Sequence, residues 1–272
     1  MRSLFIPVFA FLLSLFVVGC EPVVNALAFY PDNVNIIPQE TLPRGVEEFE
    51  VTTDDGVSLY SLYLPLPGSD KVLIYFHGNA GNIYHRIPDL LRLQKAGVNV
   101  IGVSYRGYGK SAGSPSEQGL YHDGKAIYRY ATEKLGFPDE DIIFFGRSIG
   151  TTVAVDLAQN KPIAGLILVT PLTSAAEQAQ SMGLGSVSSL AGNAFDNLSK
   201  IRDVIAPVLV IHGADDRVIP YSMGRAIYEN ARGQKRFVMI DGAGHNNLQD
   251  AYAAEYWPPV FEFIQQVVDY SK

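Results

Sequence analysis

The pentapeptide G-R-S-I-G at residues 146–150 constrains this chain more than any other stretch, because its two flanks require different backbone conformations. Residues 141–145 before it form a short apolar run that predicts a buried strand, and residues 151–158 after it predict a helix. A serine in a sharp turn between a strand and a helix is typical of a nucleophile elbow, which exposes the hydroxyl at the sheet edge. Side chains in place of the two glycines would clash with the neighbouring strand and helix. Ser148 is therefore the candidate nucleophile.

Composition and charge narrow the classes of protein to which the chain can belong. Its 272 residues are 47% hydrophobic and 18% charged, which suits one globular domain with a sizeable core and does not suit a disordered chain. The net charge is −7 and the pI is about 5.2, and the sequence contains no run of basic residues. A nucleic-acid partner is therefore not expected.

The N-terminus has the pattern of a targeting segment. Residues 4–18 are almost continuously apolar after Arg2, which is short for a membrane span of about 20 residues but typical of a signal-peptide core. The run ends in V-V-G-C and resembles the lipobox of bacterial lipoproteins, in which the cysteine is lipidated and becomes the new N-terminus. Cys20 is the only cysteine, so it has no disulfide partner within the chain. The alternatives are an ordinary buried thiol or an uncleaved anchor helix.

These features divide the chain into three parts. Residues 1–19 are predicted to be a signal peptide, residues 20–45, with four prolines, a tether from a lipid on Cys20, and residues 46–272 the folded domain. The lipid would hold the protein on a membrane surface, on the periplasmic side or at the cell surface. Residue 21 is Glu, whereas in such lipoproteins an Asp here often means retention at the inner membrane. This difference weakly favours the outer membrane in an organism that has one.

The domain alternates between strand and helix patterns. Two antiparallel strands at 48–51 and 57–64 are expected around the turn signal D-D-G at residues 54–56. The later strands are continuously apolar, which indicates burial on both faces, and helical segments separate most of them. The pattern predicts an α/β fold with a mostly parallel central sheet, helices on both faces, and ligands at the carboxyl ends of the strands. These strands are expected at 71–76, 98–103, 142–145, 163–169, 208–211 and 237–240, and the helices at about 84–95, 116–135, 149–160, 221–232 and 250–270.

The candidate nucleophile needs two partners from elsewhere in the chain. A serine hydroxyl is a poor nucleophile at neutral pH, so a base must take its proton and an acid must orient the base. Of the five histidines, His245 lies in a glycine-rich loop directly after the last predicted strand, which makes it the candidate base. The acid is expected in the loop after the preceding strand, where Asp215 and Asp216 compete. Either aspartate could instead brace the turn before the next helix.

Backbone amides are the candidate donors to the oxyanion of a tetrahedral intermediate. One is the N–H of Ile149, at the start of the predicted helix, where the helix dipole also helps. The other is expected in the loop H-G-N-A-G-N at residues 77–82, where the N–H of Asn79 is the candidate. His77 in the same loop is predicted to be structural rather than catalytic.

The order serine, aspartate, histidine resembles the α/β-hydrolase superfamily, and five motifs carry the resemblance over about residues 46–270. It is closest to a cap-poor group of membrane-anchored serine hydrolases, such as protein depalmitoylases, with bacterial relatives often labelled serine aminopeptidase-like. The group's H-G-x-x-D-x-x-x-P pattern implies Asp216 as the acid. Ser104 stands where many relatives have Asp, but this position lies outside the triad. The motifs read F-H-G-N-A-G-N at 76–82, Y-R-G-Y-G-K-S at 105–111, G-R-S-I-G at 146–150, H-G-A-D-D-R-V-I-P at 212–220 and G-A-G-H-N at 242–246.

Residues 171–206 connect two predicted strands and are too short for a true cap domain, although they include a mildly apolar segment at 182–192. One interpretation is an open cleft with a mobile rim suited to small or exposed acyl groups. The other is the ordinary helix that follows this strand. Tyr105, Tyr108 and Tyr121 could line a pocket, but packing in the core or at an edge is the more common fate of such side chains.

The resemblance implies a serine hydrolase that cleaves carboxylic ester or thioester bonds, through an acyl-enzyme, in a small-molecule or acylated substrate. A serine peptidase of the aminopeptidase-like kind is the alternative, because it uses the same triad. A surface lipoprotein that binds a ligand without catalysis is a third interpretation, and the presence of all three triad residues argues against it. No metal or organic cofactor is implied, since the sequence has no H-E-x-x-H motif, cysteine cluster or dinucleotide fingerprint. No oligomeric state is predicted.

Overall fold

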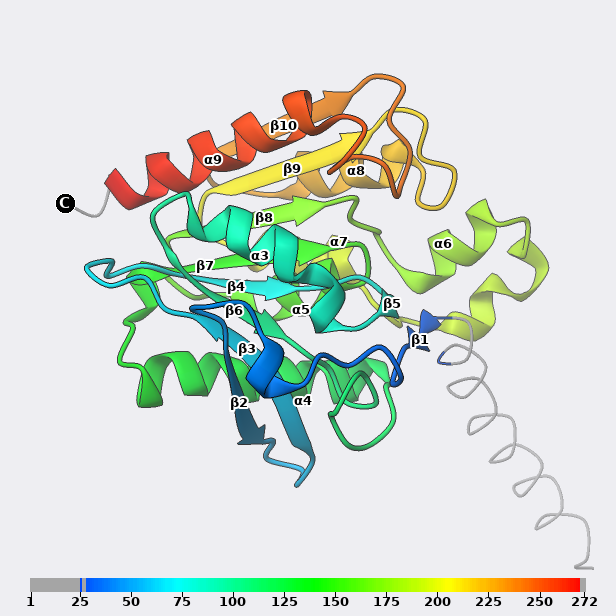
Figure 1. Cartoon of the computed structure of the whole chain (residues 1–272). Coiled ribbons are helices and arrows are strands. Elements are labelled where there is room, and N and C mark those ends of the chain that lie inside the picture. The colour runs from blue at the N-terminus through cyan, green and yellow to red at the C-terminus, as the bar shows by residue number, and fades with distance from the viewer. Residues whose placement is uncertain (1–24, 26–27, 270–272) are drawn as a thin grey trace, which may run out of the picture.

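The centre of the molecule is an eight-stranded sheet, which Figure 1 shows between layers of helices. The computed structural model describes residue 25 and residues 28–269. The strand order is β10-β9-β8-β7-β4-β6-β3-β2, with antiparallel pairing from β2 to β6 and parallel pairing elsewhere. The predicted mostly parallel sheet with antiparallel N-terminal strands is thereby confirmed. The strands are β2 (Glu47–Thr52), β3 (Ser58–Leu64), β4 (Val72–Phe76), β6 (Asn99–Val103), β7 (Ile142–Arg147), β8 (Gly165–Val169), β9 (Val208–Gly213) and β10 (Lys235–Ile240).

Helices cover both faces of the sheet, and this explains the apolar character of the strands. Successive side chains of a strand point to opposite faces. In β4, Leu73 and Tyr75 pack in one hydrophobic cluster, whereas Ile74 and Phe76 pack in another across the sheet. Every residue of β4, β6 and β8 is buried. The first face carries α3 (Ile87–Gln94) and α9 (Ala253–Asp269), and the second carries α4 (Glu117–Arg129), α5 (Gly150–Ala158), α7 (Asn197–Lys200) and α8 (Tyr221–Asn230).

Helix ends lie close to the predicted residues where a local signal marks them. The hydroxyl of Ser116 accepts a hydrogen bond from the backbone N–H of Gly119 at 3.1 Å, and this cap begins α4. The helix predicted at 116–135 continues past α4 as a π-helical turn, Tyr130–Lys134. The C-terminal helix begins later than predicted, at Ala253, because residues 247–252 form turns before it.

The segment that precedes the sheet packs on the domain. β1 (Tyr30–Pro31) pairs in parallel with β5 (Ala80–Gly81), which lies in the loop after β4. The side-chain amide of Asn82 donates hydrogen bonds to the backbone carbonyls of Asp32 and Asn35, at 3.1 and 3.0 Å. The loop after β4 is thus held against the N-terminal segment by both backbone and side-chain hydrogen bonds.

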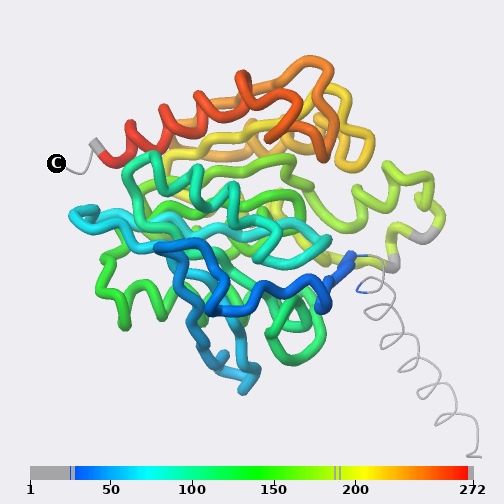
Figure 2. Tube along the Cα trace, in the orientation of Figure 1, coloured from blue at the N-terminus to red at the C-terminus, as the bar shows by residue number. Residues whose placement is uncertain are grey.

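This packing overturns part of the predicted tether at residues 20–45. From residue 28 onward the prediction is wrong, since Phe29 is buried at 6% exposure and the chain follows the domain surface, as Figure 2 shows in dark blue. The four prolines do not distinguish the two cases, because proline fixes φ at a value that suits both a free linker and an extended segment packed on the domain. The predicted signal peptide at residues 1–19 and the predicted lipidation residue Cys20 lie outside the described residues.

The connection between β8 and β9 consists of short helices. α6 (Ala175–Ser181) is followed by 3₁₀ turns at Gly185–Ala191 and then by α7. The prediction of little or no cap domain is thereby confirmed. Among the described residues, no helix combines the length and the apolar character that a membrane crossing requires.

Candidate active site

Ser148 lies in a strained turn between β7 and α5. Its φ is +54°, a left-handed conformation that is uncommon for residues with a side chain. A Cβ atom on Gly146 would come within 2.6 Å of the Cα atom of Thr151. A Cβ atom on Gly150 would come within 2.2 Å of the carbonyl oxygen of Phe76. Both glycines are therefore sterically required, and the turn has the elbow geometry that the sequence predicts.

The three predicted triad residues meet at the carboxyl ends of β7, β9 and β10. Ser148 Oγ lies 3.1 Å from Nε2 of His245, and Nδ1 of the same ring lies 2.7 Å from Oδ2 of Asp216. An ionised carboxylate only accepts hydrogen bonds, so Nδ1 must carry the proton and Nε2 is free to accept one from the serine hydroxyl. The arrangement orients the ring as a base toward Ser148.

The structure separates the two competing aspartates. Asp216 has a fully buried side chain in hydrogen-bond contact with His245, whereas Asp215 is exposed to solvent. The backbone N–H of Asp215 donates to the carbonyl of Ala243 at 2.9 Å, which ties the two loops together. Asp215 thus braces the turn, as one of the sequence interpretations expects, and Asp216 faces the histidine.

Hydrogen bonds keep Asp216 ionised despite its burial. Burial alone raises the pKa of this carboxyl group, but hydrogen bonds from His212 and His245 outweigh that effect and place the pKa below its ordinary value. Oδ1 also accepts the backbone N–H groups of Val218 and Ile219, at 2.8 and 2.9 Å. These two amides fix which oxygen faces the histidine.

Sequence reasoning missed two residues that support the triad. His212 is completely buried, and its Nε2 lies 2.9 Å from the carbonyl oxygen of Ile219 and 3.4 Å from Oδ2 of Asp216. Its place four residues before the aspartate in a recognised motif was the available signal. Arg147 is buried at 8% exposure and donates from Nη2 to the carbonyl oxygen of His245 at 3.3 Å. No sequence signal pointed to that contact, because 98 residues separate the partners.

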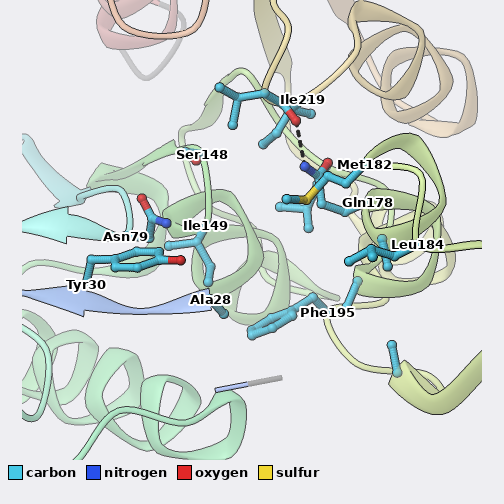
Figure 3. A pocket seen from close by; sticks show the side chains of 15 residues that line it. Ala28, Tyr30, Asn79, Ser148, Ile149, Gln178, Met182, Leu184, Phe195 and Ile219 are labelled. Carbon is cyan, nitrogen blue, oxygen red and sulfur yellow. Dashed lines mark hydrogen bonds between the residues drawn. The ribbon is translucent and has the colours of Figure 1, made fainter. Parts of the chain in front are cut away.

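The two residues whose amides are predicted for the oxyanion site line the same pocket as the serine. Figure 3 shows Asn79 and Ile149 next to each other, below Ser148 in that view, and all three residues line the pocket. Ile149 directly precedes the first residue of α5, so its N–H has no acceptor within that helix. The carbonyl oxygen of Asn79 accepts the N–H of Tyr30 at 2.9 Å and the hydroxyl of Tyr108 at 2.7 Å. These bonds fix the peptide plane that follows Asn79.

His77 and the tyrosines near the site lie in the core. His77 is completely buried, and this burial lowers its pKa to about 3, so the ring is neutral. The hydroxyl of Tyr105 donates to the carbonyl oxygen of His77 at 3.1 Å. Tyr105, Tyr108 and Tyr121 are all buried, and none of them lines the pocket beside the serine. This outcome agrees with the packing interpretation of the tyrosines and with a structural His77.

A pocket of about 320 Å³ opens beside Ser148, at the small end of the range for ligand sites. One wall comes from Ala28 and Tyr30 of the N-terminal segment, and another from the segment 172–195 between β8 and α7. The loop after β9 contributes Val218 and its neighbour. None of the fifteen lining residues, whose side chains Figure 3 draws, has a charged side chain. Residues 172–195 therefore contain the helix that one sequence interpretation expects, and they also form a wall of the pocket.

One group of possible metal ligands lies elsewhere in the described residues. Asp54, Asp55 and His122 have ligand atoms within 4.8 Å of one another, at the turn between β2 and β3. Arg106 forms hydrogen bonds with both oxygens of Asp55, and Nδ1 of His122 lies 2.6 Å from Asp54. Asp55 is thus paired with the guanidinium of Arg106, and Asp54 with the ring of His122.

Comparison with known proteins identifies relatives that match two thirds or more of this chain. A family model described as alpha/beta hydrolase fold matches residues 71–193. The alpha/beta hydrolase domain-containing protein aho-3 of Caenorhabditis elegans is 39% identical over 186 residues, which cover 68% of this chain and 55% of that relative. Alpha/beta hydrolase domain-containing protein 17C of Xenopus laevis is 35% identical over 221 residues, 80% of this chain and 70% of the relative. The human protein 17B is 31% identical over 223 residues, 81% and 76% of the two chains.

Solved structures support the same fold. An esterase of Pyrococcus furiosus superimposes with a TM-score of 0.73 at 21% identity, covering 88% of this chain and 99% of the esterase. An alpha-beta hydrolase of Vibrio vulnificus superimposes with a TM-score of 0.63 at 22% identity, covering 78% and 80% of the two chains. At these identities the likeness concerns the fold, and the chemistry has to be argued from the side chains of this chain.

Proposed function

This chain belongs to the α/β-hydrolase family, and we propose that it is a serine hydrolase that cleaves carboxylic ester or thioester bonds. The observation that carries the proposal is the hydrogen-bonded series from Ser148 through His245 to the ionised Asp216. Nucleophile, base and orienting acid are the three parts that acyl transfer by serine requires. Their position beside a pocket gives an acyl group room to bind.

In the first half-reaction, the Ser148 oxygen attacks the carbonyl carbon of the substrate while Nε2 of His245 takes the hydroxyl proton. Asp216 stabilises the resulting imidazolium through Nδ1. The N–H groups of Asn79 and Ile149 donate to the oxyanion of the tetrahedral intermediate, which in other enzymes contributes about 100- to 1,000-fold per donor. His245 then returns the proton to the alcohol or thiol leaving group, and the acyl group remains on Ser148.

In the second half-reaction, water replaces the leaving group. Nε2 of His245 takes a proton from the water molecule as its oxygen attacks the acyl carbon. Collapse of the second tetrahedral intermediate releases the carboxylic acid and returns the proton to Ser148. His245 takes up and returns the proton in both half-reactions. The proposal therefore requires no cofactor.

The pocket supports an acyl substrate over the aminopeptidase-like alternative. An aminopeptidase must bind the charged amino terminus of a peptide, which calls for a carboxylate close to the nucleophile. None of the residues that line this pocket has a carboxylate, and most of them are apolar. An apolar wall instead gains free energy from burying an acyl chain.

We also propose that the protein is a lipoprotein, held at a membrane by a lipid on Cys20 after removal of residues 1–19. The support is the apolar run followed by V-V-G-C. The domain would then lie on the periplasmic side or at the cell surface, with the outer membrane favoured where one exists. The packed segment from residue 28 leaves residues 20–27 as the connection between lipid and domain.

Covalent labelling with a fluorophosphonate tests the nucleophile, and a substrate panel tests the bond. The wild-type chain should label, and Ser148→Ala should not label and should lose several orders of magnitude in turnover while melting like the wild type. Nitrophenyl esters of rising chain length should be cleaved, and an aminoacyl amide should not. Wild-type turnover in a folded Ser148→Ala protein would refute the mechanism, and faster cleavage of the amide would favour the peptidase alternative.

A further inference from the structure

The mouth of the pocket carries exposed apolar side chains. We infer that four of them, Tyr30, Met182, Leu184 and Val218, form a surface that docks on a lipid bilayer, and we call this surface the apolar rim. Their exposed fractions are 55%, 65%, 40% and 48%. The inference rests on the proposed function, because the docked state matters only if the pocket takes an acyl group.

Exposed large hydrophobic side chains are concentrated at the rim, whereas elsewhere on the described surface they occur singly. In the described residues, eight large hydrophobic side chains are prominently exposed, and four of these eight line this one pocket. Single exposed apolar residues are common on soluble proteins, whereas a group of them around a site marks an interaction surface. The pocket behind the rim has no charged lining residue, so the apolar surface continues inward to Ser148.

Three separate segments build the rim, and direct contacts hold them together. The side chain of Gln178 in α6 donates to the carbonyl oxygen of Val218 at 2.6 Å, which joins the helix to the loop after β9 (Figure 3). Phe29 packs edge-on against Phe195 at a centroid distance of 6.2 Å, which joins the N-terminal segment to the end of the segment 172–195. The rim is therefore a composite surface whose apolar side chains are exposed at the mouth of the pocket, while polar and aromatic contacts join the segments beneath it.

The path of the chain indicates that a bilayer, rather than a second copy, covers the rim. Ala28 and Tyr30 line the pocket, and only eight residues separate Ala28 from Cys20, where the apolar run at residues 4–18 ends. Eight fully extended residues reach at most about 29 Å. A membrane attachment at Cys20 therefore keeps Ala28, at the edge of the pocket, within that distance of the bilayer surface. An acyl chain could then pass from the bilayer to Ser148 without crossing water.

Two esters with the same leaving group measure docking. The full chain is reconstituted in phosphatidylcholine vesicles and assayed with nitrophenyl hexanoate in solution and nitrophenyl hexadecanoate in the bilayer. The measured quantity is the ratio of the hexadecanoate rate to the hexanoate rate, because the hexanoyl group also enters the pocket but does not come from the bilayer. Met182→Glu combined with Val218→Glu should lower this ratio about tenfold, which corresponds to about 1.4 kcal/mol. The matched control, Met239→Glu with Ile205→Glu, changes residues of similar exposure (47% and 59%) outside the pocket and should leave the ratio as in the wild type.

Each other outcome overturns the inference. An unchanged ratio in the rim variant, or an equal fall in the control, would show that the rim has no special role at the bilayer. A wild-type dimer that the rim variant dissociates would show that a second copy covers the rim. If the double variant melts below the wild type, Leu184→Gln provides the same comparison in a milder form. If the wild type does not label with a fluorophosphonate, the proposed function itself is refuted. Failure of the docking inference and failure of the proposed function are thus distinguishable.

Discussion

Replacing Asp216 by asparagine should abolish most activity without changing the shape of the site. Two backbone N–H groups, those of Val218 and Ile219, point at Oδ1 from 2.8 and 2.9 Å. An asparagine must keep its oxygen there, because its NH2 group would otherwise face two donors. The NH2 group therefore takes the place of Oδ2, which in the wild type lies 2.7 Å from Nδ1 of His245.

That orientation reverses the polarity of the ring. A donor opposite Nδ1 requires Nδ1 to be the acceptor, so the proton moves to Nε2, which then cannot take a proton from Ser148. A wrong tautomer of this kind costs about 10⁴-fold in kcat, or roughly 5 kcal/mol of transition-state stabilisation. Asp215→Asn is the control, since Asp215 is exposed and contacts the site only through its backbone. It should change kcat by less than about twofold.

Steady-state kinetics with nitrophenyl acetate on both variants, with melting curves to show that each is folded, provide the measurement. Equal losses in the two variants, or a larger loss at Asp215, would mean that the carboxylate in contact with His245 is not the one that orients it during turnover. Retention of more than about a tenth of the activity by Asp216→Asn would refute the tautomer argument itself.

Three further changes test the elbow, its supports and the N-terminus. Gly150→Ala places a Cβ atom 2.2 Å from a carbonyl oxygen at the end of β4. It should lower the free energy of unfolding by at least about 2 kcal/mol, seen as a lower melting temperature. In the control Gly185→Ala, the nearest atom to the new Cβ lies 3.9 Å away, so this variant should melt like the wild type. His212→Ala should lower kcat about tenfold and shift its pH profile, whereas His212→Gln, which keeps a nitrogen donor near Nε2, should recover most of the rate; equal rates in both would exclude a positioning role. Intact mass spectrometry should find a lipid on Cys20 of the mature wild type and none in Cys20→Ser, and an unmodified Cys20 with Met1 still present would contradict the lipoprotein proposal.

The fold could be predicted because its determinants are local. Strands buried on both faces are continuously apolar, and the glycines beside Ser148 mark a close approach of two backbones. Each predicted residue at the site follows a strand of the parallel sheet, so the topology alone brings the three together at one edge. The choice between Asp215 and Asp216 was different, since neighbouring residues in one loop share almost all local signals. Only the motif spacing separated them.

Contacts between distant segments could not be predicted. Arg147 reaches the carbonyl of His245 across 98 residues, and nothing in the sequence near either residue depends on the other. The docked N-terminal segment is similar: its backbone pairs with β5, and backbone pairing leaves little trace in the side chains. Phe29 was the one clue, as a large apolar residue in a stretch that was otherwise interpreted as a linker.

The apolar rim shows why exposure has to be measured on the structure. Met182 and Val218 are of residue types that also occur in the core. Their hydropathy alone therefore predicts that both are buried. The fold leaves them about half exposed, and an apolar side chain in water contributes little to the stability of the folded state. They would gain free energy only when another apolar phase covers them. The matched substitutions at Met239 and Ile205 separate that gain from the general effect of placing a charge on the surface.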